Sequence, residues 1–315
     1  MPRLPSTRRS VATRALHRPR MAVLIAAVAL MFSLQHASAT AVDGRTDDRA
    51  KPVLFIHGYS GANCEGDWGF LLDHLRASGW TAEFRVLKFL SGDTNCNARA
   101  GMTMDCMGCF GSHSAWFGHS GTTHNSNTSI RHLSWHLAHY IATNFTAKGI
   151  AVDVVGHSMG GLMIRYALAK QGVDSFPRLL VEDVTTLGSP HNGAIFATLT
   201  GSTQGAEMEP WSTLVTWLKA NAKNPQGTGG TDWTIIGSHG DLIVQEDTAT
   251  AMSVAHRWRY TTSPTWIGHS DYMRSSKIGS TRRAQYPCVS SPGWCETSTF
   301  YPTQMIRAAT RYGSH

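Results

Sequence analysis

A serine that could act as a nucleophile lies in Gly156-His157-Ser158-Met159-Gly160, which fits the pattern G-x-S-x-G. A run rich in β-branched residues, 150–155, precedes it, and apolar residues at helical spacing follow it up to Gly172. Strand, sharp turn and helix are the context in which this pattern presents a reactive hydroxyl. The flanking glycines leave room for a strained turn, and the helix start adds unpaired N–H groups. This context argues against a chance match in a chain with 30 glycines and predicts that Ser158 is a nucleophile.

An acid is expected to follow this serine in the sequence. A serine hydroxyl needs a histidine to accept its proton and a carboxylate to orient that histidine, and here the order is serine, acid, histidine. Asp241 lies just beyond the apolar run 234–237, whereas Asp232 precedes that run. Asp183 begins its own strand and would face away from the site. We therefore predict Asp241 as the acid.

The base must be chosen among 16 histidines, so position decides. His269 follows the last apolar strand-like run and precedes Tyr272-Met273, a candidate final helix. His256 is the alternative, but it stands at the start of a strand and so at the wrong edge of a parallel sheet. We predict His269 as the base.

Two N–H donors are needed for the oxyanion that forms after attack. One is the amide of the residue after the nucleophile, Met159. The other is expected in the loop after the first strand, where His57-Gly58 lets the chain turn close to the site. We predict Tyr59 as this second donor, with Ser60 as the alternative.

Strand and helix patterns alternate along the chain. Strands are predicted over 53–56, 84–89, 183–187, 234–237 and 256–260, and helices over 70–79 and 130–145. This alternation predicts an α/β fold with a mainly parallel central sheet and helices on both faces. Two long segments, 91–127 and 200–232, interrupt the pattern and are predicted to be loop or lid insertions.

The first 39 residues have the features of a secretory signal peptide. Six arginines and no acidic residue precede or flank the apolar run 21–32, and Ala37-Ser38-Ala39 offers a cleavage site. The apolar run is too short to span a bilayer easily, although an uncleaved anchor is the alternative. We expect a signal peptide over 1–39 and a secreted catalytic domain over 40–315, extracellular or periplasmic, without a stable membrane anchor.

The net charge of +7 comes mainly from that leader. Without its six arginines, 22 basic residues face 21 acidic residues, which leaves a net charge near +1. A nucleic-acid or anionic-membrane partner inferred from the high pI is therefore excluded. The expected partner is an ester or lipid substrate, and we expect a monomer.

All six cysteines follow the leader, and an even number in an exported chain favours disulfides. Cys288 and Cys295 flank a short loop with Pro and Gly and are predicted to pair with each other. The other four can pair in three ways: Cys64, Cys96, Cys106 and Cys109. The alternative is zinc on the C-x-x-C pair with nearby histidines: Cys106, Cys109, His113, His119 and His124. No second C-x-x-C follows, and we predict no metal and no other cofactor.

Three histidines lie on the predicted helix over 130–145: His132, His136 and His139. The first two are four residues apart, as are the zinc ligands in H-E-x-x-H, but no acidic residue lies between them. We interpret all three as surface or groove residues.

Five blocks of sequence resemble bacterial lipases and esterases of the α/β-hydrolase fold: 53–61, 154–161, 186–193, 241–244 and 268–270. The resemblance is strongest to secreted class 2 triacylglycerol lipases and small Bacillus-type lipases. It implies a serine carboxylic ester hydrolase with the triad on Ser158, Asp241 and His269. It also implies oxyanion donors at Met159 and Tyr59. The Cys/His-rich insertion and the tail after about residue 280 depart from the family.

Aromatic residues in the two insertions are candidates for contact with an acyl chain: Trp116, Phe117, Trp211 and Trp217. Insertions after parallel strands gather at the carboxyl edge of the sheet, where Ser158 is expected. The alternative is that these residues anchor the loops. A serine nucleophile argues against dehalogenases and epoxide hydrolases. Other candidates are a polyester depolymerase, a cutinase-like esterase, an acyltransferase, or a binding protein with a dead site.

Overall fold

The structure, a computed structural model, describes residues 49–99, 124–261, 267–274, 282–287 and 294–299. The predicted signal peptide lies outside these residues, and so do seven positions singled out above: Cys106, Cys109, His113, Trp116, Phe117, His119 and Cys288. Within the described part of the chain, no helix is both long and apolar enough to cross a membrane.

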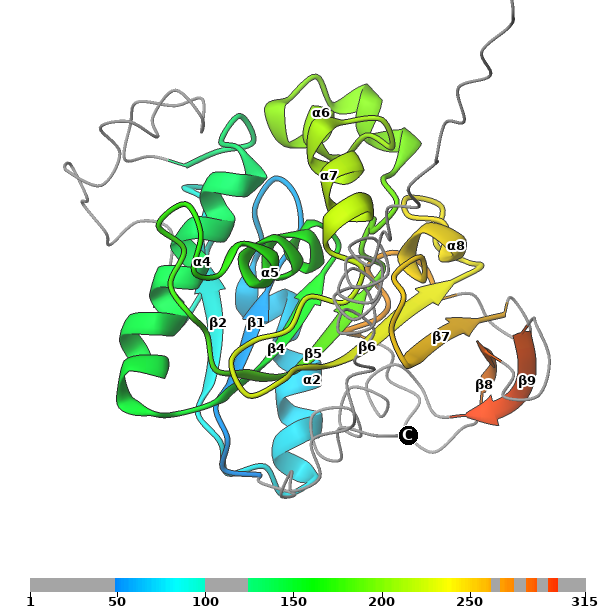
Figure 1. The fold of residues 1–315 in the computed structure, drawn as a ribbon. Coiled ribbons are helices and arrows are strands. Elements are labelled where there is room, and N and C mark those ends of the chain that lie inside the picture. The colour runs from blue at the N-terminus through cyan, green and yellow to red at the C-terminus, as the bar shows by residue number, and fades with distance from the viewer. Residues whose placement is uncertain (1–48, 100–123, 262–266, 275–281, 288–293, 300–315) are drawn as a thin grey trace, which may run out of the picture. The chain divides into compact units, whose positions relative to one another are not determined.

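A sheet forms the centre of the fold, with the strand order β3-β2-β1-β4-β5-β6-β7-β8-β9 among the described residues (Figure 1). Its first seven strands are parallel: β1 (Val53–Ile56), β2 (Phe84–Lys88), β3 (Ala98–Arg99), β4 (Val152–His157), β5 (Val181–Leu187), β6 (Asp232–Ser238) and β7 (His256–Tyr260). An antiparallel hairpin extends the edge: β8 (Arg282–Pro287) and β9 (Trp294–Thr299). The predicted mainly parallel α/β sheet is confirmed.

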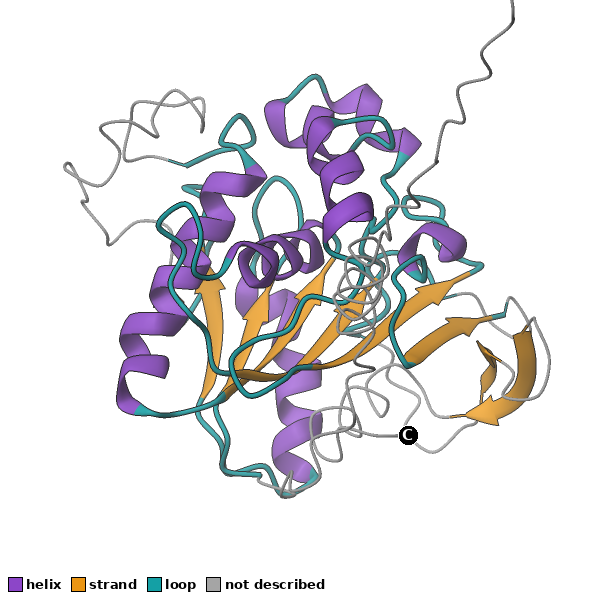
Figure 2. Ribbon diagram, in the orientation of Figure 1, coloured by secondary structure: helices purple, strands orange, loops and turns teal. Residues whose placement is uncertain are grey.

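Helices cover both faces of this sheet, as Figure 2 shows. Helix α2 (Cys64–Ala77) packs on one face, and α4 (Ile130–Asn144) and α5 (Met159–Lys170) pack on the other. Successive side chains of a strand point to opposite faces. In β1, Leu54 and Ile56 accordingly join the core with α4 and α5, whereas its other two residues join the core with α2.

Helix α4 corrects one prediction. Ten of its residues are buried, among them His132 and His136, which are each 2% exposed. The interpretation of these two histidines as surface or groove residues is therefore wrong, because the buried face of α4 is wider than its aliphatic residues indicate. His139 is half-buried and donates a hydrogen bond to the Ser175 carbonyl (2.9 Å).

The second predicted insertion folds into short helices beyond the carboxyl ends of the central strands (Figure 1). They are α6 (Thr203–Met208) and α7 (Thr213–Asn221), and a third short helix, η3 (Ile195–Thr200), directly precedes them. Arg165 of α5 is buried and donates hydrogen bonds to the carbonyls of His191, Leu218 and Ala222. One α5 side chain thus ties this insertion to the body of the fold. Two further short helices are η2 (Thr146–Lys148) and α8 (Glu246–Ala249).

Strand β1 lies between β2 and β4, so the chain builds the sheet in opposite directions from this point. In open parallel sheets, ligands bind at the carboxyl ends of the strands where the order reverses. The loop after β1 and the turn after β4 meet there, and they carry Tyr59 and Ser158.

Candidate active site

Ser158 occupies a strained turn between β4 and α5. Its φ is +54°, a region that residues other than glycine rarely adopt. The turn is close-packed, since a Cβ at Gly160 would lie 2.4 Å from the Ile56 carbonyl oxygen and 2.7 Å from that of His57. A side chain there would push the turn away from β1. The glycine two residues after Ser158 is therefore required by this geometry.

The structure brings the predicted serine, histidine and aspartate together. Ser158 Oγ lies 2.9 Å from His269 Nε2, and His269 Nδ1 lies 2.8 Å from Asp241 Oδ2. Ser158 follows β4 and Asp241 follows β6, while His269 lies in the segment after β7. In this arrangement Ser158 donates to the imidazole, and the imidazole donates to the carboxylate, as proton transfer from a serine requires.

The alternative acid and base lie elsewhere. Asp232 begins β6 and His256 begins β7, and their side chains are 3.4 Å apart. Asp183 lies near the start of β5, 3.8 Å from Lys51. All three residues therefore lie toward the amino ends of their strands, away from Ser158.

Four donors fix the Asp241 carboxylate. Oδ1 accepts the N–H groups of Ile243 (2.9 Å) and Val244 (2.8 Å), and Oδ2 accepts the Tyr272 hydroxyl (3.2 Å) as well as His269. Burial, followed by the charge of Asp241, raises the pKa of Tyr272 well above its ordinary value, so Tyr272 stays a donor. Residues 269–274 form turns, so the helix predicted at Tyr272-Met273 is wrong.

Gly188, at the end of β5, lies directly against this acid–histidine pair. Its φ is +52°, and a Cβ there would be 2.8 Å from Asp241 Oδ2 and 3.3 Å from His269 Nδ1. Any side chain at this position would displace the groups that hold the imidazole. The strand before Gly188 was predicted from its apolar residues, but nothing in the sequence pattern indicates this role of the glycine.

His157 supports the loop that carries His269. Its Nε2 donates to the His269 main-chain carbonyl (2.7 Å), and the two rings lie 4.7 Å apart. Burial, followed by the proximity of His269, lowers the pKa of His157 to about 3. The ring is therefore neutral near pH 7 and acts as a fixed donor. This role could not be predicted, because the residue before the serine is unspecified in G-x-S-x-G.

The predicted oxyanion donors lie beside Ser158. Met159 is the first residue of α5, where backbone N–H groups have no partner within the helix. A Cβ at Gly58 would lie 2.8 Å from Ser158 Cβ, so the loop that carries Tyr59 is in contact with the nucleophile. These positions suit the predicted donor roles of Tyr59 and Met159, which remain predictions.

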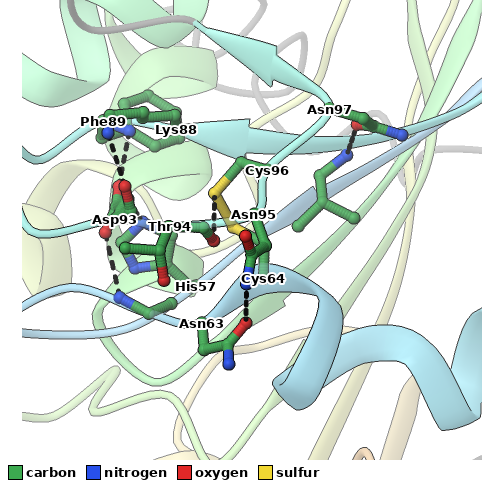
Figure 3. The surroundings of a disulfide bond; sticks show 12 residues. His57, Asn63, Cys64, Lys88, Phe89, Asp93, Thr94, Asn95, Cys96 and Asn97 are labelled. Carbon is green, nitrogen blue, oxygen red and sulfur yellow. Dashed lines mark hydrogen bonds and ion pairs between the residues drawn. A yellow bond between two sulfur atoms is a disulfide. The ribbon is translucent and has the colours of Figure 1, made fainter.

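Asp93 clamps the loop after β1 (Figure 3). Its Oδ2 accepts hydrogen bonds from His57 Nε2 (2.7 Å) and from the N–H groups of Phe89 and Leu90, and its Oδ1 accepts one from Ala62 (3.0 Å). Burial acts to raise the pKa of Asp93, but the hydrogen bond and charge of His57 outweigh it, so the pKa lies below its ordinary value. This residue was missed, since a single aspartate in a polar segment has no periodic signal.

A disulfide joins Cys64, the first residue of α2, to Cys96 in the loop after β2 (Figure 3). Two backbone hydrogen bonds lie beside the disulfide. The Cys64 N–H donates to the Thr94 carbonyl (2.9 Å), and the Thr94 N–H donates to the Ala62 carbonyl (2.9 Å). Cys64 and Cys96 pair in one of the three predicted schemes, while the other two cysteines of that scheme, Cys106 and Cys109, lie outside the described residues. Cys295 is disulfide-bonded, but Cys288 lies outside the described residues, so their pairing stays a prediction.

A cavity of about 370 Å³ opens over Ser158. Its apolar lining includes Phe196, Met208, Ile243, Val244 and Met273. Neither Trp211 nor Trp217 is among the described residues that line it.

The two tryptophans proposed for acyl contact lie elsewhere on the second insertion. Trp217 packs on Tyr166 of α5, with ring centroids 5.5 Å apart, and Lys170 Nζ lies 4.9 Å from its ring. Trp211 is 64% exposed. The anchoring alternative therefore describes Trp217.

Several solved structures are similar to this chain, three lipases among them. Lipase BlEst2 of Bacillus licheniformis in mature form is 15% identical, with a TM-score of 0.49, over 74% of this chain and 91% of that chain. Lipase B of Aspergillus fumigatus is 14% identical, with a TM-score of 0.46, over 75% and 51%. A monoacylglycerol lipase of Paleococcus ferrophilus is 14% identical, with a TM-score of 0.41, over 69% and 85%. No curated protein matched the sequence. The alpha/beta hydrolase family matches residues 53–295.

Proposed function

This chain belongs to the alpha/beta hydrolase family, and from that premise we propose that it is a serine carboxylic ester hydrolase of the lipase or esterase type. The observation that carries the proposal is the hydrogen-bonded series from Asp241 through His269 to Ser158. An acid, an imidazole and a serine in this order are the parts of acyl transfer through an acyl-enzyme.

In the proposed reaction, Ser158 Oγ attacks the ester carbonyl carbon while His269 Nε2 takes the hydroxyl proton. The N–H groups of Met159 and Tyr59 stabilise the oxyanion. His269 then gives its proton to the departing alcohol, which leaves an ester on Ser158. A water molecule, deprotonated by His269, attacks that ester and releases the carboxylic acid. Asp241 stays ionised and holds the imidazole through both steps.

An acyl ester with an apolar chain is the proposed substrate class. The cavity size is in the range of small-molecule sites, and its lining is largely apolar. Large apolar side chains are also exposed next to it, among them Phe196 and Ile243. Such exposure is typical of surfaces that bind apolar partners.

The test is turnover of p-nitrophenyl esters, with labelling of Ser158 by an organophosphonate. The proposal predicts hydrolysis and one labelled serine. Absence of both would favour a binding protein with a dead site. Release of acid from a polyester film would favour a depolymerase, and transfer to an added alcohol in preference to water would favour an acyltransferase.

Export is proposed as well, from the signal-type leader over 1–39. The Cys64–Cys96 disulfide supports it, because disulfides persist in oxidising compartments. Amino-terminal sequencing of the protein from the culture medium or periplasm should give a start at Thr40. An intact leader on cytoplasmic protein would contradict the proposal.

A further inference from the structure

Three histidine rings meet in the interior of the protein: His124, His132 and His136. Each is 2% exposed, and their ring centroids lie 4.6–4.9 Å apart. His132 and His136 are four residues apart and share one face of α4, while His124 comes from the segment before that helix. None of the three is among the described residues that line the cavity over Ser158. The cluster is therefore separate from the candidate active site.

One nitrogen of each ring points into a common centre. His132 Nε2 lies 3.1 Å from His124 Nε2 and 3.0 Å from His136 Nε2. An imidazole nitrogen carries either one proton or one in-plane lone pair. His132 Nε2 therefore has one proton or one lone pair with which to meet two ring nitrogens. Direct hydrogen bonding between the rings does not account well for both contacts.

The hydrogen bond that His124 makes determines which of its ring nitrogens carries a proton. Its Nδ1 donates to the Phe89 carbonyl (3.2 Å), so in the neutral ring Nε2 holds a lone pair directed at the other two rings. A backbone carbonyl on the second nitrogen is the usual support of a metal-binding histidine.

A divalent cation satisfies all three nitrogens at once. Zn–N bonds of about 2.0–2.1 Å place the ligand nitrogens of a tetrahedral site about 3.3–3.4 Å apart. The two separations of 3.0 and 3.1 Å are close to that value. Neutral imidazole suits borderline cations such as zinc, whereas calcium and magnesium prefer oxygen ligands. We propose that His124, His132 and His136 bind a structural zinc ion through their Nε2 atoms.

This ion would fasten α4 to the loop that follows β2. His124 is hydrogen-bonded to the Phe89 carbonyl, and the Phe89 N–H donates to Asp93, which also holds His57. Bound zinc therefore stabilises the clamp behind the loop that carries Tyr59. Its site lies apart from Ser158, so its effect is on folding stability and on the order of that loop.

The experiment measures zinc binding directly, on the whole purified protein. Metal content is determined by mass spectrometry for the wild type, His132→Gln and His136→Gln. His139→Gln is the matched control, since His139 lies on the same helix, one turn after His136, and contacts the Ser175 carbonyl. We expect about one zinc ion per chain in the wild type and the control, and at least a tenfold weaker affinity in the other two variants.

Thermal unfolding gives a second readout. After removal of metal with a chelator, zinc at about 100 times its Kd should raise the Tm of the wild type and of His139→Gln by about 5–10 °C. The Tm of His132→Gln should not change. Equal zinc affinity in His132→Gln and the wild type, or no zinc uptake by the chelated wild type, would overturn the proposal.

A cobalt substitution of the wild type keeps the test decisive if the variants do not fold. Cobalt bound by imidazole nitrogens gives weak visible bands of tetrahedral type without a sulfur-to-cobalt charge-transfer band. A charge-transfer band would assign the ion to cysteine and overturn the proposal. Loss of cobalt binding after modification of the histidines would agree with it.

Discussion

The two sides of the cavity over Ser158 are built in different ways. On the reaction side, Ser158, Asp241 and His57 are buried and held by hydrogen bonds, and the Cys64–Cys96 disulfide closes the neighbouring loops. The apolar rim includes Phe196 and Ile243, which line the cavity and are 50% and 38% exposed. The groups on the reaction side are held in one arrangement. The rim side chains are exposed and contribute little to the hydrophobic core.

This difference indicates a division of work. Groups that transfer protons and stabilise charge must be held at fixed distances, and burial and multiple hydrogen bonds provide this. Side chains that contact an acyl chain need area rather than direction, because apolar attraction has no preferred orientation. Substitutions on the reaction side should therefore change rate and stability, and substitutions on the rim should change substrate preference.

The largest effect is expected for the triad. Ser158→Ala or His269→Ala should each lower kcat by about 10⁴–10⁶-fold, and the double variant by little more, because the members act as a unit. The measurement is ester hydrolysis by each single variant and by the pair. Ser253→Ala and His256→Ala serve as controls of the same kind, and both should retain wild-type kcat. Losses that add up across the pair would contradict the assignment.

The disulfide beside the loop after β1 should give the next largest effect. Cys64 and Cys96 are 32 residues apart, and closing a loop of this size stabilises a protein by about 3–4 kcal/mol in the chain-entropy account. Cys64→Ser with Cys96→Ser should lower the free energy of unfolding by that amount, as measured in urea. It should also lower kcat, because the disulfide closes the loops that bear Tyr59.

The control for this double variant is Cys288→Ser with Cys295→Ser, the cysteine pair predicted from sequence. Cys295 lies in β9. If these two cysteines pair as predicted, this variant should lose stability at unchanged kcat. An equal loss of kcat in both double variants would show that kcat follows general stability, and the comparison between the reaction side and the rest of the fold would fail.

A pH-dependent effect is expected from His157. Its pKa is about 3 in the folded protein and 6.5 ordinarily, so the unfolded state binds the proton more readily. Its contribution to stability is complete above about pH 6.5 and is lost as the pH falls toward 3, by up to about 1.4 kcal/mol per pH unit.

His157→Gln removes this titration and keeps a donor for the His269 carbonyl. Urea unfolding between about pH 4 and 6.5 should therefore show a weaker pH dependence of stability than the wild type. His239→Gln is the control, because a third of the His239 side chain is exposed. If the free energy of unfolding of His157→Gln depends on pH as strongly as that of the wild type, burial of His157 does not cause the acid sensitivity of the protein.

The sequence predicted the features that a local pattern specifies. The bounds of β1 and β7 match the predicted strands, and α4 ends one residue before the predicted helix does. Apolar residues in these segments recur at the period of their own element, so each segment can be recognised without its neighbours. The serine, acid and histidine were found for a similar reason, since each follows or ends a recognisable strand.

Contacts between distant segments could not be predicted. Asp93 and His57 are 36 residues apart, and Tyr272 and Asp241 are 31 apart. Their meeting depends on how the loops pack, and loops carry no period. Large apolar residues of an insertion also look alike in sequence. Only their positions distinguish Phe196, which lines the cavity, from Trp217, which packs on α5.

The smallest effect is expected on the rim, and it depends on chain length. Phe196 lines the cavity and is 50% exposed, so its removal costs the fold little but removes apolar surface that a long acyl chain can cover. Each methylene buried is worth about 0.8 kcal/mol, so loss of contact with one or two of them corresponds to about 4–15-fold in rate. Phe196→Ala should therefore lower kcat/KM by that factor for octanoate or longer p-nitrophenyl esters and hardly at all for acetate. Trp217→Ala, in α7, is the matched aromatic control, and it should lower the Tm through lost packing on Tyr166 and change kcat/KM equally at every chain length. A length-dependent loss in Trp217→Ala, or a uniform one in Phe196→Ala, would reverse the roles assigned to these two aromatic residues and remove the distinction between rim and reaction side.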